Sequence, residues 1–185
     1  MRKTIIISFI IIVTIALTYG LISYIEMPSF LFAWILNFLL MMCVFSFTEA
    51  LKSPFSSSYY NQKKWEEKGK VYELLGIHFF RKLLVLIGWE KLNKKANPVD
   101  KNTKALLHLH YRTKQSELGH IIIFFVVLGF TVYVAFTFGI LKAMWLVLLN
   151  IVLNLYPVLL QRYNRPRLER AIILSKHREV GIKGV

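Results

Sequence analysis

Residues 118–141 read LGHIIIFFVVLGFTVYVAFTFGIL, and this stretch decides the fold. It carries no Asp, Glu, Lys or Arg. Because a helix rises about 1.5 Å per residue, about 20 such residues cross the roughly 30 Å hydrocarbon core of a bilayer. The chain has three further stretches of this kind, at residues 4–25, 28–48 and 143–160. Since backbone groups in lipid must be hydrogen-bonded within their own segment, we predict four membrane-spanning helices.

The overall composition supports the same class of protein. Of the 185 residues, 56% are hydrophobic and 18% charged, whereas a soluble domain is nearer half apolar and a quarter charged. The net charge is +14, but the basic residues lie between apolar runs, so we expect no nucleic acid partner. The single cysteine, Cys43, lies inside such a run, which excludes a disulfide framework and a cysteine-based zinc site. We therefore expect one all-α integral membrane domain over residues 1–185.

The basic residues also predict how the chain is oriented. If the N-terminus, residues 49–117 and the tail 161–185 all face the cytoplasm, 23 of the 24 Lys and Arg residues lie on that side, as the positive-inside rule requires. Tight outer hairpins then fall at 26–29 and 139–142. The apolar run at 4–25 is too long for a cleaved signal peptide, so we expect it to remain as a span.

Residues 49–117 are too many for a simple connection. Between residues 65 and 89, apolar residues recur at helical spacing and Gly76 interrupts them. We predict an amphipathic segment here that either lies on the membrane surface or re-enters the leaflet. Arg81 and Lys82 would reach the lipid head groups.

A polar loop is expected at residues 93–103, and Thr103 is the predicted N-cap of a helix that runs into the third span. His108 and His110 lie on this helix. Residues two apart on a helix point about 200° apart, so they cannot bind one metal ion, although on a strand they could. With no cysteine nearby, we expect no metal site.

Asparagines occur at membrane depth, where polar groups cost free energy. Asn150 and Asn154 share one face of the fourth predicted helix, and Asn37 lies in the second. They either form interhelical hydrogen bonds, worth about 0.6–2 kcal/mol each, or a polar track along a substrate slot. Pro157 has no N–H for the carbonyl of Leu153, so we expect the fourth helix to bend there.

Glu117 and His120 lie three residues apart at the cytoplasmic entrance to the third span, and hence on one helical face. A carboxylate beside an imidazole fixes its tautomer and raises its basicity. That arrangement suits a general base that takes a proton from an alcohol. Gly119 between them would let a substrate approach closely. The alternative is that the pair only anchors the helix at the membrane boundary.

The last polar cluster follows the fourth span, where residues 161–168 read QRYNRPRL. Pro166 disfavours helix in the residue before it, so we expect the span to end at 163–164 and a short surface helix to follow at 171–174. Guanidinium groups bind phosphate bidentately, so the arginines of a non-helical turn here could clamp a phosphate. The alternative is ordinary arginine flanking of a span. The candidate residues are Gln161, Arg162, Asn164, Arg165 and Arg167.

The octapeptide at 161–168, preceded by Asn154 and Pro157, resembles the C-terminal signature of the glycosyl-4,4'-diaponeurosporenoate acyltransferases. These are small bacterial membrane enzymes of carotenoid synthesis. The run TKxxELxH at 113–120 resembles the entry to that family's paired C-terminal spans. A looser match is WExxGKxY at 65–72. The first span looks like an addition relative to the shortest members of the family, and the segment between Trp89 and Thr113 shows little likeness.

The resemblance implies transfer of a fatty acyl group from a thioester, either acyl-CoA or an acyl carrier, to a hydroxyl of a sugar on a carotenoid acid. It places the protein in the bacterial cytoplasmic (inner) membrane, among lipids, with an active site facing the cytoplasm and no cofactor beyond the thioester co-substrate. On this interpretation His120 is the catalytic base and Glu117 orients it. The implied substrate contacts are Gln161, Arg162, Asn164, Arg165, Arg167, Asn154, Trp65, Arg81 and Lys82.

Two alternatives remain at this point. A non-enzymatic scaffold that binds anionic lipids or partner proteins through its basic cytoplasmic face would also explain the charge and the spans. A different acceptor, such as a polyprenol-linked sugar, would keep the chemistry and change the substrate.

Overall fold

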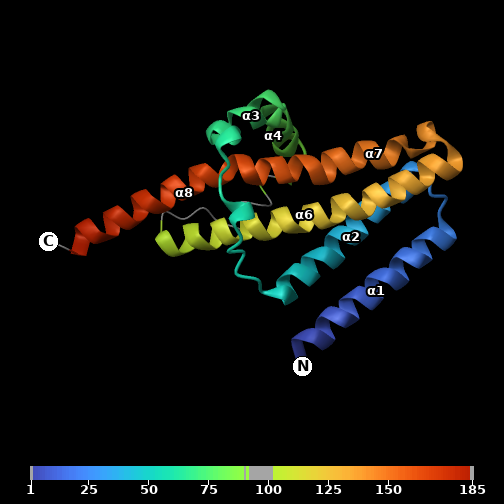
Figure 1. Ribbon diagram of the computed structural model, residues 1–185, viewed down its shortest axis with the longest axis horizontal. Helices are drawn as coiled ribbons and strands as arrows, with labels where there is room; N and C mark the ends of the chain where they lie inside the picture. The colour runs from blue at the N-terminus through green and yellow to red at the C-terminus, as the bar shows by residue number, and fades with distance from the viewer. Residues whose placement is uncertain (1, 90, 92–101, 184–185) are drawn as a thin grey trace. The chain divides into compact units, whose positions relative to one another are not determined.

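A computed structural model describes residues 2–89, 91 and 102–183 of the chain (Figure 1). Within these residues the secondary structure is helical. Four helical stretches are long and apolar enough to cross a membrane: α1 (Arg2–Tyr24), α2 (Phe30–Leu51), α6 (Thr103–Phe138) and the stretch Ile140–Glu179. The prediction of an all-α chain with four candidate spans is confirmed.

The chain divides into two compact units, which are described separately. The first, here called the span unit, comprises Met1–Ser53 and Ser116–Val158. The second, here called the basic unit, comprises Pro54–Gln115 and Leu159–Val185. The polar loop predicted at 93–103 lies outside the described residues except for its last two.

In the span unit, α1 and α2 form a hairpin and lie side by side (Figure 1). The turn lies where it was predicted, because Ser29 caps α2: its hydroxyl accepts a hydrogen bond from the backbone N–H of Phe32 at 3.1 Å. The core of this unit is formed mainly by buried side chains of α2, of α6 and of residues 143–149. Among the most buried are Phe32, Leu36, Ile123, Val127, Val134 and Leu146.

The second hairpin also lies where it was predicted. The chain leaves α6 at Gly139, whose φ of +98° favours glycine, and passes through the 3₁₀ turn η3 (Ile140–Ala143) into α7 (Met144–Asn150). A π-helical turn, η4 (Ile151–Leu155), follows and leads directly into α8 (Tyr156–Lys183). This π turn ends two residues before Pro157, and the bend that was expected at Pro157 stays a prediction.

The predicted end of the fourth helix at 163–164 is wrong, and so is the non-helical arginine turn. Helix α8 continues through Pro166 to Lys183 and includes the surface helix that was expected at 171–174. Proline removes one backbone donor and biases the residue before it, but it does not forbid helix when other contacts hold the backbone. Here the side chains of Arg162 and Arg165, on the turn before Pro166, are bonded to the segment 59–66.

The predicted N-cap of the third helix is displaced by one residue. The side chain of Asn102 accepts a hydrogen bond from the N–H of Lys104 at 2.9 Å, and Asn102 therefore caps α6. The hydroxyl of Thr103 instead pairs with that of Ser175 on α8 at 2.7 Å. Both residues are buried, so this polar pair packs the start of α6 against α8 within the basic unit.

The rest of the basic unit is built from short helices: η1 (Ser58–Tyr60), η2 (Lys64–Gly69), α3 (Lys70–Leu74) and α4 (Ile77–Leu86). Gly69 (φ +102°) and Gly76 (φ +78°) separate the last three, which confirms the predicted interruption at Gly76. Helix α4 buries Ile77 and Phe80 and exposes Phe79 and Leu86. The surface-lying or re-entrant position that was predicted for this segment stays a prediction.

Candidate functional sites

A chain of three asparagines and one histidine crosses the core of the span unit. The amide nitrogen of Asn154 donates to Oδ1 of Asn37 at 2.7 Å and to Oδ1 of Asn150 at 2.9 Å. Nδ1 of His120 lies 3.4 Å from Oδ1 of Asn154. The three asparagines are at most 3% exposed, whereas His120 is partly exposed. The interhelical hydrogen bonds that were one interpretation of these residues are present.

The outer ends of this chain bond to backbone carbonyls. Asn37 donates to the carbonyl of Ala33 at 2.8 Å, and Asn150 donates to the carbonyl of Phe124 at 3.0 Å. The His120 ring also makes a hydrogen-bond contact with the backbone of Leu153. The carbonyl of Leu153 receives no helical hydrogen bond from Pro157, because proline has no N–H. In a span every polar group needs a partner, and this network supplies partners to a set of groups that would otherwise face lipid.

The partner that the structure gives to His120 is thus the amide of Asn154. Glu117 lies one turn earlier on α6 and is fully buried. Its role in orienting His120 stays a prediction, as does the use of Asn154 as a substrate contact.

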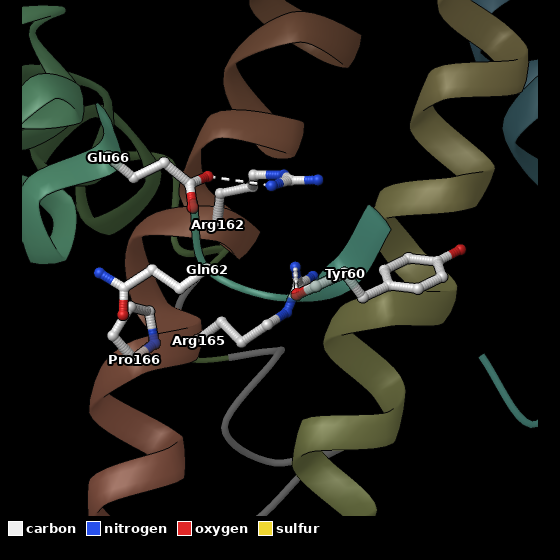
Figure 2. Close-up of a pocket in the computed structure, with 6 residues that line it drawn as sticks. All are labelled: Tyr60, Gln62, Glu66, Arg162, Arg165 and Pro166. Carbon is white, nitrogen blue, oxygen red and sulfur yellow. Dashed lines mark hydrogen bonds and ion pairs between the residues drawn. The ribbon is translucent and has the colours of Figure 1, made fainter. Parts of the chain in front are cut away.

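In the basic unit, Arg162 forms a buried ion pair with Glu66 (Figure 2). The two atoms, Nη1 and Oε1, are 2.9 Å apart, and the side chains are 9% and 5% exposed. The guanidinium also donates to the carbonyl of Tyr59 at 2.8 Å and lies over its ring.

Glu66 collects further hydrogen bonds, from the hydroxyl of Tyr72 and from the backbone N–H of Lys63 at 2.5 Å. The latter is one half of a capping box at the start of η2. Burial acts to raise the pKa of the Glu66 carboxyl, but the hydrogen bonds, with that of Tyr72 first, and the charge of Arg162 outweigh it. The pKa is therefore held below its ordinary value of 4.5.

Arg165 points from the next turn of α8 toward Tyr60, whose carbonyl it bonds at 3.1 Å (Figure 2). It is 3% exposed. Together with Arg162 and Pro166 it lines a hollow over residues 60–66 that has room for about one water molecule. The structure therefore brings two of the three predicted clamp arginines together, but it uses both to hold this segment on α8.

Arg167 is not among the residues that line that hollow. Its Nη1 donates to the carbonyl of Tyr163 at 2.6 Å, its guanidinium lies 3.7 Å above the Tyr163 ring, and its Nη2 is 3.4 Å from Oε1 of Glu73. Half of the Arg167 side chain is exposed. Of the three predicted clamp arginines, it is the one whose side chain is half exposed.

The remaining candidates lie on the surface of the basic unit or in helix α8. Trp65 is 60% exposed and contacts the ring of Tyr72 by an edge. Arg81 and Lys82 are exposed on α4, and Gln161 and Asn164 are partly buried on α8. Their contacts with substrates stay predictions.

The two histidines considered for a metal site lie on helix α6, so the strand alternative is wrong. His110 lies 3.3 Å from Oε1 of Glu169, whereas His108 is exposed. Among the residues that the structure describes, no group of three or more His, Cys, Asp or Glu side chains is placed to hold a metal ion.

The motifs at 65–72 and 161–168 are joined in space. The Glu66–Arg162 ion pair links them, and Gly69 lies against Tyr163: a Cβ at position 69 would be 3.2 Å from Cδ2 of that ring. The glycine is required both by this close approach and by its positive φ. Both motifs therefore contribute residues to one packed contact within the basic unit.

Sequence reasoning missed the residues that complete these clusters. Tyr60 and Glu73 were not singled out, and Glu66 and Tyr72 were noted only as positions of the motif at 65–72. Helical spacing shows neighbours within an element, but the ion pair between residues 66 and 162 joins positions that are 96 apart. Only the fold reveals such a contact.

Comparisons with known proteins agree with the resemblance. A sequence model described as glycosyl-4,4'-diaponeurosporenoate acyltransferase matches residues 56–173. No match is found among curated proteins, and none among solved structures. The matched region covers well over half of the chain and contains both joined motifs together with His120, Asn150 and Asn154. The chain belongs to the glycosyl-4,4'-diaponeurosporenoate acyltransferase family.

Proposed function

We propose that this protein transfers a fatty acyl group from a thioester donor to a hydroxyl of a glycosylated carotenoid or a similar lipid-linked sugar. Membership of the acyltransferase family is the observation that carries this proposal. The four candidate spans support a lipid acceptor, which would reside in the bilayer. We place the protein in the bacterial cytoplasmic membrane with its termini and its active site toward the cytoplasm, as its basic residues favour.

His120 is the general base in this proposal. Its ring takes the proton from the acceptor hydroxyl, whose oxygen attacks the thioester carbonyl carbon and forms a tetrahedral oxyanion. The C–S bond then breaks, the ester is released, and the thiolate leaving group receives the proton back from the imidazolium. An imidazole held by a hydrogen bond at Nδ1 is suited to this cycle because its other nitrogen can accept and return the proton. Glu117 retains its predicted supporting role.

The donor carries phosphate groups, so it needs a basic surface. We propose Arg167, with half of its side chain exposed, as the main phosphate contact, assisted by the exposed Arg81 and Lys82. Arg162 and Arg165 hold segment 59–66 on α8.

The test is acyl transfer by purified protein in lipid nanodiscs. Acyl-CoA labelled on the acyl chain is incubated with a lipid extract that contains glycosylated carotenoid, and in parallel with an extract that contains only the unglycosylated carotenoid acid. We expect label in an ester of the glycosylated species, one free CoA thiol per ester formed, and no product in the parallel reaction. Label on another lipid-linked sugar would support the acyl transfer and identify a different acceptor. Absence of transfer from both acyl-CoA and an acyl carrier would contradict the proposal and favour the lipid-binding scaffold.

A further inference from the structure

The proton position on His120 can be deduced from the asparagine network, starting at its outer ends. Asn37 and Asn150 each donate their amide nitrogen to a backbone carbonyl, that of Ala33 and that of Phe124. A carbonyl oxygen only accepts hydrogen bonds, so the amide nitrogen of each asparagine must face it. The oxygens of both asparagines are thereby turned toward Asn154.

The orientation of Asn154 follows from these two oxygens. Its NH₂ group has two hydrogens, and both are used, one toward Asn37 and one toward Asn150. If its oxygen and nitrogen were exchanged, a carbonyl oxygen would face two other oxygens in a buried site. The oxygen of Asn154 must therefore face His120.

A neutral imidazole that faces an oxygen through Nδ1 must carry its proton on that nitrogen. The His120 ring also makes a hydrogen-bond contact with the backbone of Leu153, the residue next to Asn154. Nε2 is then left with its lone pair. The π turn at 151–155 holds Asn154 within the network, and irregular turns of this kind recur at functional sites.

We propose that Asn37, Asn150 and Asn154 are positioning residues that fix the proton of His120 on Nδ1 and leave Nε2 as the basic atom. This inference rests on the proposed function, because the network positions a base only if His120 acts as one. Asn37 touches neither the ring nor a reacting atom and acts only through Asn154. The network is here called the relay: two backbone carbonyls orient Asn37 and Asn150, these two orient Asn154, and Asn154 orients the ring of His120.

The tautomer can be measured directly. Protein labelled with ¹⁵N-histidine is placed in nanodiscs, the His120 resonances are assigned by comparison with His120→Ala, and the ¹⁵N shifts show which ring nitrogen carries the proton. We expect the proton on Nδ1 in the unmodified protein. A proton on Nε2 would overturn the inference without any need for a variant.

Two variants test the relay. Asn154→Leu removes the acceptor beside Nδ1, and Asn37→Leu removes an acceptor that orients Asn154. We expect both to lose the single tautomer and to lower kcat by about 10- to 100-fold, less than loss of the base itself, with the KM for the thioester unchanged. Thr131→Val is the matched control: Thr131 is buried in the same helix as His120, and its hydroxyl bonds only the nearby carbonyl of Val127 at 2.8 Å. It should change neither the tautomer nor kcat.

The outcomes separate this inference from the proposed function. An Nδ1 proton that persists in Asn154→Leu, or a KM that rises while kcat stays constant, would overturn the positioning role even if His120→Ala is inactive. Full activity in His120→Ala would overturn the catalytic assignment, while the measured tautomers would still test the network.

Discussion

At the scale of single residues, the stability of the basic unit depends on one buried carboxylate. Glu66 neutralises Arg162, accepts from the hydroxyl of Tyr72 and accepts from the N–H of Lys63, so three partners meet at one group. A buried ion pair adds little compared with a well-packed apolar pair, but removing one partner leaves an uncompensated charge. Removing Glu66 is therefore expected to destabilise the unit by more than the net stabilisation that the ion pair provides.

Glu66→Gln should lower the free energy of unfolding of this unit by about 3 kcal/mol at pH 7, because Arg162 keeps its charge and loses its counter-ion. Denaturant titration in detergent, with hydrogen exchange followed over peptides from 58–74, measures the change. The control is Glu73→Gln, since Glu73 is 39% exposed and 3.4 Å from Arg167. It should cost less than about 1 kcal/mol. Equal losses in the two variants would contradict this account of the ion pair.

The same carboxylate predicts how stability depends on pH. Its pKa in the folded protein lies below the ordinary value of 4.5, so the stabilisation is complete above pH 4.5 and is lost as the pH falls through the lowered pKa. The stability difference between the unmodified protein and Glu66→Gln should be constant from pH 7 to 5 and shrink below pH 4.5. A difference that grows on acidification would be inconsistent with a lowered pKa.

Gly69→Ala should destabilise the basic unit by about 2 kcal/mol, because the backbone is held at φ +102° and the new Cβ would press on the ring of Tyr163. Thermal unfolding in detergent measures the effect. Gly129→Ala is the control: Gly129 lies within α6, where a Cβ meets nothing within 4 Å. It should leave stability unchanged or raise it slightly. A tolerated alanine at position 69 would mean that the close contact is not needed.

At the scale of elements, the spans and hairpins could be predicted because their cause is local. The cost of leaving backbone groups unbonded in lipid makes each apolar run helical, and the break at Gly139 ends α6. The continuation of α8 through Pro166 could not be predicted, since the bonds of Arg162 and Arg165 to segment 59–66 are tertiary. The π turn before Pro157 likewise has no sequence period of its own.

Pro166→Ala should stabilise α8. Proline in a helix interior is about 3 kcal/mol less favourable than alanine, and the substitution restores an N–H that can bond the carbonyl of Arg162. We expect an increase of about 1–3 kcal/mol in the free energy of unfolding. Pro54→Ala, outside the helices that the structure describes, should change stability by less than about 1 kcal/mol and in the opposite direction. Destabilisation by Pro166→Ala would show that the ring itself fills a needed space in the hollow over 60–66.

At the scale of the whole molecule, the proposed activity requires a defined orientation of the chain in the membrane. In a Cys43→Ser background, a cysteine at Lys142 should react with a membrane-impermeant maleimide added to intact cells. A cysteine at Lys104 should react only after the membrane is permeabilised. Both positions are exposed, so access to the reagent, and not burial within the protein, decides the result. The reverse pattern would place the basic residues outside and contradict the predicted topology.

The central claim is that His120 is the base of an acyl transfer, and the rate of a single turnover tests it most directly. Protein in nanodiscs is saturated with glycosylated carotenoid and mixed with a limiting amount of labelled acyl-CoA, and ester formation is followed for the unmodified protein and for His120→Ala. We predict a rate at least 100-fold lower in the variant, with unchanged folding and unchanged donor affinity. The control is His108→Ala, at an exposed histidine, and it should form the ester at the rate of the unmodified protein. A His120→Ala protein that forms the ester at more than about a tenth of the normal rate would contradict the claim.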